Sequence, residues 1–187
     1  MFNWNSTAGS CPFTTSDDND FTAGCGKDGA YQVTAKKDGE FWSSQEDAKQ
    51  AHQVVAAQMQ LTSGSATAAQ FGVRCAVQDN THAYTFTVKT NGRWAIFKQA
   101  GDQWQILAKG DDQTLQSGSV ALVAYCNPDN SLALEANGRQ LGRAKDDSGS
   151  PYTGTAAGVI VSLEKGGTPP ESVRVSALRI TLASVSG

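Results

Sequence analysis

The sequence predicts an all-β protein, an antiparallel two-sheet sandwich of the jelly-roll type. Most apolar residues alternate with polar ones, which is the period of a strand with one buried face. Asn91-Gly92 and Asn137-Gly138 lie between alternating runs, and Asn-Gly is a strong hairpin signal because both residues accept positive φ. About twelve such runs follow one another, separated by Gly, Pro and Asn turns and without strand–helix alternation.

Size and charge narrow the class of protein. The chain has 187 residues, enough for one domain with a substantial core. Its formal charge of -3 and the lack of a basic stripe argue against a nucleic-acid partner. No apolar run reaches the roughly 18 residues of a membrane span, so membrane contact is expected only through an anchor in a parent protein. Met1 leads into a polar stretch, so we expect either a cytosolic protein or an excised extracytoplasmic domain.

Four cysteines favour the extracytoplasmic alternative. They are Cys11, Cys25, Cys75 and Cys126, none with C-x2-C spacing and none near a histidine, so a zinc site is poorly supported. Of the three possible pairings we favour Cys11–Cys25, which would close a polar loop, and Cys75–Cys126, which would join two core strands. The alternative is four free thiols that pack as small hydrophobic groups in a cytosolic protein.

The N-terminal part of the chain is polar and lacks clear periodicity. Residues 1–18 are expected to form a polar segment tied by a disulfide, and residues 19–187 to form the single jelly-roll domain. Asp17, Asp18 and Asp20 could ligate calcium through hard oxygens. They lack the spacing of an EF-hand loop, so a solvated acidic turn is the favoured interpretation and calcium stays open. No cofactor is expected.

Two strands are predicted before residue 44, from Ala30 to Lys36 and from Glu40 to Ser43, with a turn between them. The next segment, Ser44 to Leu61, is ambiguous. Its composition and a capping-box pattern at Ser44 and Asp47 favour a helix. Its second half alternates as a strand would, and all-β surroundings override weak helix propensity. We therefore predict a strand from about residue 52.

The rest of the chain predicts a continuous series of strands. Gln70 to Gly110 reads as a four-stranded antiparallel meander, with strands over residues 71–77, 82–88, 94–98 and 104–108. Tyr84, Phe86 and Ile96 are expected in its core. The remaining predicted strands are Ser119 to Cys126, Leu132 to Ala136, Arg139 to Ala144, Ala156 to Leu163 and Val173 to Leu182.

The order of these pieces resembles a known family. DGAYQV, FWSS, FGVRCAVQDNTHAYTFTVKTNGRWAIFKQAGDQWQILAKG, SLALEANGRQLG and VRVSALRITL together resemble the bacterial branch of the concanavalin A-like (laminin G-like) jelly rolls, over about residues 19–183. That branch is similar to 3-keto-disaccharide hydrolase-like domains, ectodomains of bacterial membrane Ser/Thr kinases and surface lipoproteins. The resemblance implies a fold but not a ligand. It supports the Cys75–Cys126 pairing, because many secreted members have matching cysteines.

The sequence offers little for catalysis. A glycosidase needs two opposed carboxyl groups, and glycanases of this superfamily carry a Glu-x-Asp-x-x-Glu strand motif. No predicted strand here carries such a pair, and Glu135, the only acid centred in one, reads as a solvent-face residue. No G-x-S-x-G elbow occurs. Neither His52 nor His82 has an obvious Asp or Ser partner in sequence. We therefore expect no enzymatic activity.

Binding is better supported. Sugar sites combine aromatic faces with hydroxyl, amide or Arg groups. Arg74 lies on the strand face opposite Cys75, and a charged residue there must be paired or face a wet surface. We expect it to share a groove with residues of the neighbouring strands. The predicted ligand-binding residues are Arg74, Thr85, Thr87, Arg93, Trp94, Phe97 and Trp104.

These observations predict a non-catalytic, extracytoplasmic ligand-binding or sensor domain that recognises a carbohydrate or a cell-envelope glycan. One alternative is a glycoside hydrolase-like enzyme acting on a modified disaccharide, and another is a structural adhesive module. The alternative for Arg74 is that it forms an ion pair with Glu135 or another carboxylate on a solvated sheet face and has no role in ligand binding.

Overall fold

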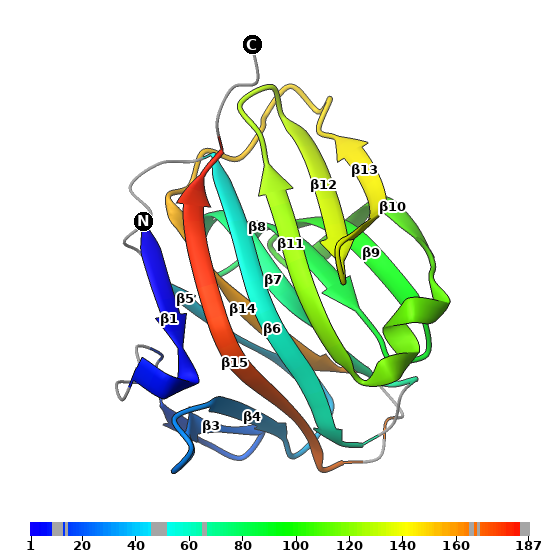
Figure 1. Ribbon diagram of the computed structural model, residues 1–187. Coiled ribbons are helices and arrows are strands. Elements are labelled where there is room, and N and C mark those ends of the chain that lie inside the picture. The colour runs from blue at the N-terminus through cyan, green and yellow to red at the C-terminus, as the bar shows by residue number, and fades with distance from the viewer. Residues whose placement is uncertain are drawn as a thin grey trace.

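Two antiparallel sheets pack face to face in the computed structural model, which describes residues 1–8, 13, 15–45, 52–64, 67–164, 167 and 169–183 (Figure 1). The described residues contain no α-helix, only the short 3-10 helices η1 (Ser6–Ala8) and η3 (Gln113–Ser117). The predicted all-β sandwich is confirmed.

The larger sheet has nine strands and faces the viewer in Figure 1. Its order is β13-β12-β11-β6-β15-β4-β3-β2, and β1 also pairs with β15. The strands are β1 (Phe2–Asn5), β2 (Ser16–Asp17), β3 (Phe21–Cys25), β4 (Tyr31–Ala35), β6 (Gln53–Ser63), β11 (Ser119–Cys126), β12 (Ser131–Ala136), β13 (Arg139–Lys145) and β15 (Glu171–Leu182).

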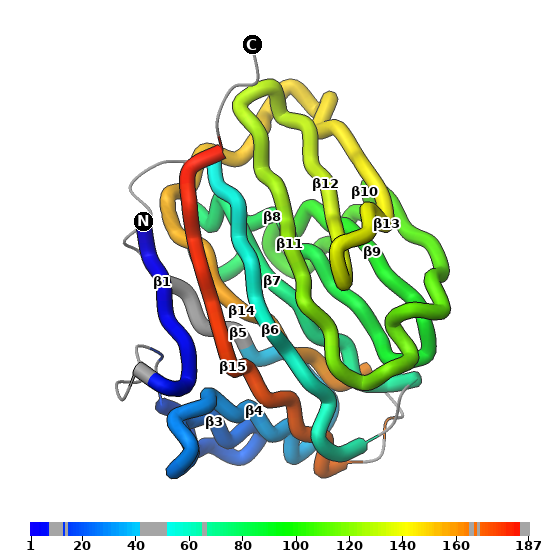
Figure 2. Tube along the Cα trace, in the orientation of Figure 1, coloured from blue at the N-terminus to red at the C-terminus, as the bar shows by residue number. Residues whose placement is uncertain are grey.

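The second sheet has six strands and lies behind the first in the same view (Figure 2). Its order is β10-β9-β8-β7-β14-β5, so the predicted meander supplies four neighbouring strands. The strands are β5 (Gly39–Gln45), β7 (Ala69–Asp79), β8 (His82–Val88), β9 (Arg93–Ala100), β10 (Gln103–Asp111) and β14 (Ala156–Leu163).

The core lies between the inner faces of the two sheets. Tyr84, Phe86 and Ile96 are buried there, as predicted. The disulfide Cys75–Cys126 is confirmed and joins β7 in one sheet to β11 in the other. Cys25 is also disulfide-bonded. Its predicted partner, Cys11, lies outside the described residues.

The ambiguous segment folds as a strand from Gln53 onward, as predicted. β6 lies between β11 and β15 and hydrogen-bonds to both, and Val55 and Met59 are fully buried. Pairing on both edges outweighs the weak helix propensity of this sequence. The capping-box pattern at Ser44 and Asp47 falls where side chains lie outside the described residues.

The N-terminal part contains more structure than its sequence predicts. β1 pairs with β15, and Trp4 is buried with its ring edge-on to Phe13 at 4.9 Å. A strand of four residues is too short for its alternation to be visible in the sequence. In the acidic cluster, Asp18 Oδ1 accepts hydrogen bonds from the backbone N–H groups of Asp20 and Phe21, as in a tight turn. The domain boundary after residue 18 stays a prediction.

The two Asn-Gly pairs form different turns. Asn137 and Gly138 both have positive φ, 53° and 78°, as a two-residue hairpin requires. In the other pair only Gly92 has positive φ, at 102°, and its N–H donates to the carbonyl of Lys89. This second turn therefore differs from the predicted one, although it still connects β8 to β9.

Candidate functional site

A groove runs over the face of the six-stranded sheet that points away from the larger sheet. It consists of two adjoining cavities of about 550 and 310 Å³. The first lies mainly over β9 and β10, and residues of all six strands line the second. Four residues line both parts and make the groove continuous: Gln70, Thr87, Phe97 and Glu164.

Aromatic and aliphatic side chains form the floor at the β10 end. Phe97 and Trp104 meet edge to face, with ring centroids 5.5 Å apart. Ile106, which lies opposite Phe97 on the next strand, is 49% exposed. A register shift between Ile106 and Ala108 then changes the alternation of β10, so that Lys109 lies opposite Ala95 and faces the groove as well.

Polar groups surround these rings. Gln70 Nε2 donates a hydrogen bond to Thr87 Oγ1. Lys89 Nζ donates to the carbonyl of Thr67 at 3.1 Å and forms an ion pair with Glu164 Oε1 at 2.5 Å. Arg93, Lys109 and Asp111 add charge at the β10 end, and Glu40 adds a carboxyl at the β5 end. The groove therefore offers both ring faces and hydrogen-bonding groups.

Five of the seven predicted ligand-binding residues line this groove. Thr87 and Phe97 line both parts, Arg93 and Trp94 line the first, and Trp104 lines the second. Their role in binding stays a prediction.

The other two predicted residues do not line the groove. Arg74 and Thr85 share its sheet face, as their alternation predicts, but both are fully buried. Arg74 Nη2 donates to Gln99 Oε1 at 2.7 Å and to the carbonyl of Asn80 at 3.3 Å. Burial lowers the pKa of Arg74 to about 10, against the opposing charges of Glu40 and Asp79.

The pairing of Arg74 with Glu135 is also ruled out by position. Glu135 lies on β12 in the larger sheet, where it accepts a hydrogen bond from Tyr125 Oη at 3.2 Å. Alternation along a strand identifies the face on which a side chain lies, but not how deeply it is covered.

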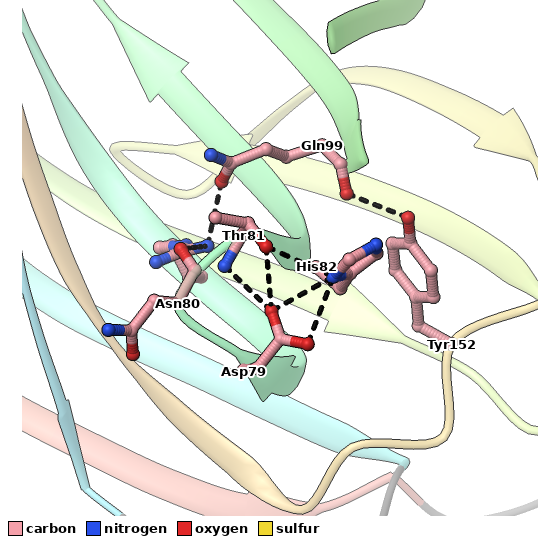
Figure 3. Close-up of polar contacts among 7 residues, drawn as sticks. Asp79, Asn80, Thr81, His82, Gln99 and Tyr152 are labelled. Atoms are coloured by element: carbon pink, nitrogen blue, oxygen red, sulfur yellow. Dashed lines mark hydrogen bonds and ion pairs between the residues drawn. The ribbon is translucent and has the colours of Figure 1, made fainter. Parts of the chain in front are cut away.

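A His–Asp pair lies at the turn between β7 and β8, and the sequence analysis missed it (Figure 3). His82 Nδ1 contacts the two carboxylate oxygens of Asp79 at 2.9 and 3.0 Å. Thr81 donates to Asp79 from both its backbone N–H and its hydroxyl. These bonds, with the Thr81 backbone contributing most, lower the pKa of Asp79 to about 2. The spacing Asp-x-x-His within a tight turn was the available signal.

This cluster stabilises a turn. The Thr81 hydroxyl donates a hydrogen bond to Asp79 and also contacts His82 Nδ1, as the dashed lines in Figure 3 show. Tyr152 packs edge-on against the His82 ring at 5.8 Å and donates its hydroxyl to the carbonyl of Gln99 at 2.7 Å. The arrangement holds the segment around Tyr152 against the end of the sheet, and none of these residues lines the groove.

A second polar cluster lies inside the sandwich. Lys98 Nζ bonds Asp146 Oδ2 at 2.7 Å, Ser148 Oγ at 2.7 Å and the carbonyl of Ser150 at 2.8 Å. Tyr84 donates its hydroxyl to the same Asp146 oxygen at 2.5 Å. Burial first, and then the Asp146 carboxylate, raise the pKa of Tyr84. Lys98, Asp146 and Tyr84 are buried, whereas Ser148 and Ser150 lie at the exposed edge of the cluster. Their hydrogen bonds to Lys98 hold the segment after β13 in place.

The described part of the chain contains no cluster of three or more potential metal-ligating residues. No helix within it is both long and apolar enough to span a membrane.

Comparison with known proteins relates the chain to others through its fold. No protein-family model and no curated protein matches it. A carbohydrate-binding module, CBM66 from Bacillus subtilis, is similar with a TM-score of 0.65 and 14% identity, over 90% of this chain and 94% of that one. A β-glucanase from Bacillus licheniformis is similar with a TM-score of 0.64 and 12% identity, over 97% of this chain and 98% of that one. A Bacillus subtilis protein of unknown function with a galectin-like fold is similar with a TM-score of 0.64 and 8% identity, over 87% of each chain. The chain therefore has the concanavalin A-like jelly-roll fold.

Proposed function

We propose that the protein is a non-catalytic carbohydrate-binding domain whose ligand occupies the groove over the six-stranded sheet. The paired rings of Phe97 and Trp104 carry this proposal. Apolar CH faces of a sugar pack on aromatic rings, and its hydroxyls need donors and acceptors close by. Gln70, Thr87 and Arg93 supply those groups around the rings.

Two further observations support the proposal. The structural neighbours include a carbohydrate-binding module and a β-glucanase on the same fold. The disulfide between the two sheets favours an oxidising compartment, outside the cytoplasm. In such a location the domain would recognise an extracellular or cell-envelope glycan, as a secreted module or as the sensor part of a membrane protein.

The proposal is tested by glycan-array screening followed by calorimetric titration of the best oligosaccharide. Replacing the groove residue Trp104 with Ala is expected to weaken binding by about tenfold or more, because ring contacts dominate such sites. Gln105→Ala is the matched control, since it is the next residue on β10, is exposed and does not line the groove. Equal affinities of wild type and Trp104→Ala would contradict the site. A chain that binds no glycan at all would favour a structural adhesive module.

A glycoside hydrolase is the second candidate, and one observation favours it. Glu40 and Glu164 line the same part of the groove. Desolvation raises the pKa of Glu40, against the opposing charge of Arg74, whereas Glu164 is ion-paired with Lys89. Two carboxyl groups in different environments beside one groove is the arrangement that glycoside hydrolysis needs.

Reducing-end release from the same oligosaccharides distinguishes the two functions. Under the binding proposal, wild type releases no sugar, and Glu40→Gln leaves affinity within about threefold. Turnover by wild type that is lost in both Glu40→Gln and Glu164→Gln would establish the hydrolase instead.

A further inference from the structure

The outer face of the nine-stranded sheet is unexpectedly apolar at its centre. β6, β11 and β12 alternate between fully buried residues and partly exposed ones. Six of the partly exposed residues there are small, aliphatic or aromatic: Val54, Ala56, Ala121, Val123, Tyr125 and Ala133. The polar Gln58 and Glu135 lie among them. Figures 1 and 2 look onto this face, and no described helix or strand crosses these three strands. A contiguous apolar patch on a solvent-facing sheet indicates an interaction surface.

One row of residues across this face has a symmetric chemical order. Val123 on β11 lies opposite Ala56 on β6, so two apolar residues form the centre of the row. Beyond Val123 lies Glu135, and beyond Ala56 lies Arg179. The row ends in an amide on each side, as the register of six strands shows: Gln140, Glu135, Val123, Ala56, Arg179 and Asn3.

We propose that this face pairs with the same face of a second copy of the chain. A two-fold axis parallel to the strands, between β6 and β11, places β12 of one copy over β15 of the other. Glu135 then meets Arg179 of the second copy, Val123 meets Ala56, and the same contacts recur on the far side of the axis. Such a self-complementary surface is what a two-fold dimer requires.

The two charged residues of the row support this occupant. Arg179 is exposed, and among the described residues it forms no ion pair with a carboxylate. Glu135 is partly exposed, and within the described parts of the chain it accepts a hydrogen bond from the neutral Tyr125 hydroxyl. A second copy would supply the missing opposite charge to both residues.

The size of the face also suits a dimer. Six strands spaced about 4.8 Å apart give a width of about 24 Å, and the eight residues of β11 give a length of about 26 Å. The resulting flat area of about 600 Å² is close to the roughly 800 Å² of accessible surface that each partner buries in a stable complex. Aligned packing of two sheets about 10 Å apart lets their small side chains interlock.

Charge reversal tests this pairing without disturbing the core. By sedimentation velocity over a concentration series, wild type is expected to form a dimer. Glu135→Arg alone and Arg179→Glu alone are each expected to raise the dissociation constant at least about a hundredfold, because like charges meet twice in each dimer. An equimolar mixture of these two variants should form a heterodimer, since each reversed charge then meets an opposite one.

Asp102→Arg is the control, because it reverses an exposed charge at the β9–β10 turn of the other sheet and should leave the dimer intact. Far-UV circular dichroism verifies that every variant is folded. A wild type that stays monomeric throughout the series, or a wild-type dimer that both reversals leave unchanged, would overturn the inference. This inference does not depend on the proposed carbohydrate binding.

Discussion

At the residue scale, the buried ion pair between Lys98 and Asp146 couples stability to pH. Hydrogen bonds from Lys98, Ser148 and Tyr84 lower the pKa of Asp146 from 3.8 to about 2 despite its burial. Between these two pH values the Asp146 carboxyl is protonated in the unfolded chain but ionised in the folded chain. The stabilisation from Asp146 is therefore complete above about pH 4 and is lost as the pH falls towards 2.

Urea denaturation across this pH range measures the effect. The free energy of unfolding of wild type should fall as the pH drops from about 4 to 2. Asp146→Ala should cost about 3–5 kcal/mol at pH 7, because Lys98 loses its buried counter-charge, and should show a weaker dependence on acid pH. Asp147→Ala, an exposed neighbour, should behave like wild type. An Asp146→Ala variant that keeps the wild-type acid dependence would contradict this assignment.

Individual site residues were predictable only in part. Alternation correctly assigned Arg74, Thr85, Thr87 and Phe97 to one sheet face, because the side-chain period of a strand is fixed. It could not separate Thr87, which lines the groove although it is only 3% exposed, from Arg74, which is fully buried and lines neither part, because depth depends on segments distant in sequence. The carboxyl of Glu164 was missed for the same reason, since it follows β14 rather than lying within a strand.

At the element scale, the packing of β13 against β9 depends on a residue without a side chain. A Cβ atom on Gly142 would lie 2.1 Å from Cη2 of Trp94. The Trp94 indole therefore occupies the space that a side chain at position 142 would need. Because Trp94 also lines the groove, this glycine connects the two sheets close to the candidate site.

Gly142→Ala is expected to lower the free energy of unfolding by about 1–3 kcal/mol, the usual cost of overpacking. Chemical denaturation followed by tryptophan fluorescence measures this loss. Gly24→Ala provides the matched control, since its new Cβ would meet its nearest atom at an ordinary 3.8 Å. If both variants lost the same free energy of unfolding, the contact with Trp94 would not be the cause of the loss in Gly142→Ala.

Strands were predictable where they were long and alternating. β11 has the predicted bounds, Ser119 to Cys126, because four inward residues mark its buried face. β6 could not be assigned from local propensity, which favours a helix. Its pairing with β11 and β15 makes it a strand. β1 and β3 escaped prediction because they have four and five residues, too few for alternation to be visible.

At the scale of the whole molecule, the Cys75–Cys126 bond limits how far the two sheets can separate on unfolding. It joins strands of opposite sheets at a sequence separation of 51. Replacing both cysteines with Ala is expected to lower the free energy of unfolding by about 2–5 kcal/mol.

Urea denaturation with and without reductant measures this loss. Reductant should destabilise wild type more than the double variant, in which only the bond of Cys25 remains to be reduced. Thiol titration of the denatured, unreduced wild type should find neither Cys75 nor Cys126 reactive. A double variant as stable as wild type would show that the bond adds nothing to folding.

The two outer faces of the sandwich differ in character, with the groove on one sheet and the apolar patch on the other. Chains joined through their larger sheets would carry their grooves on opposite sides, facing away from each other. Such a pair could not grip one flat surface with both grooves. It would act as a bivalent cross-linker that bridges separate particles or polysaccharide strands, so its activity would appear as agglutination rather than as tighter adhesion to a single surface.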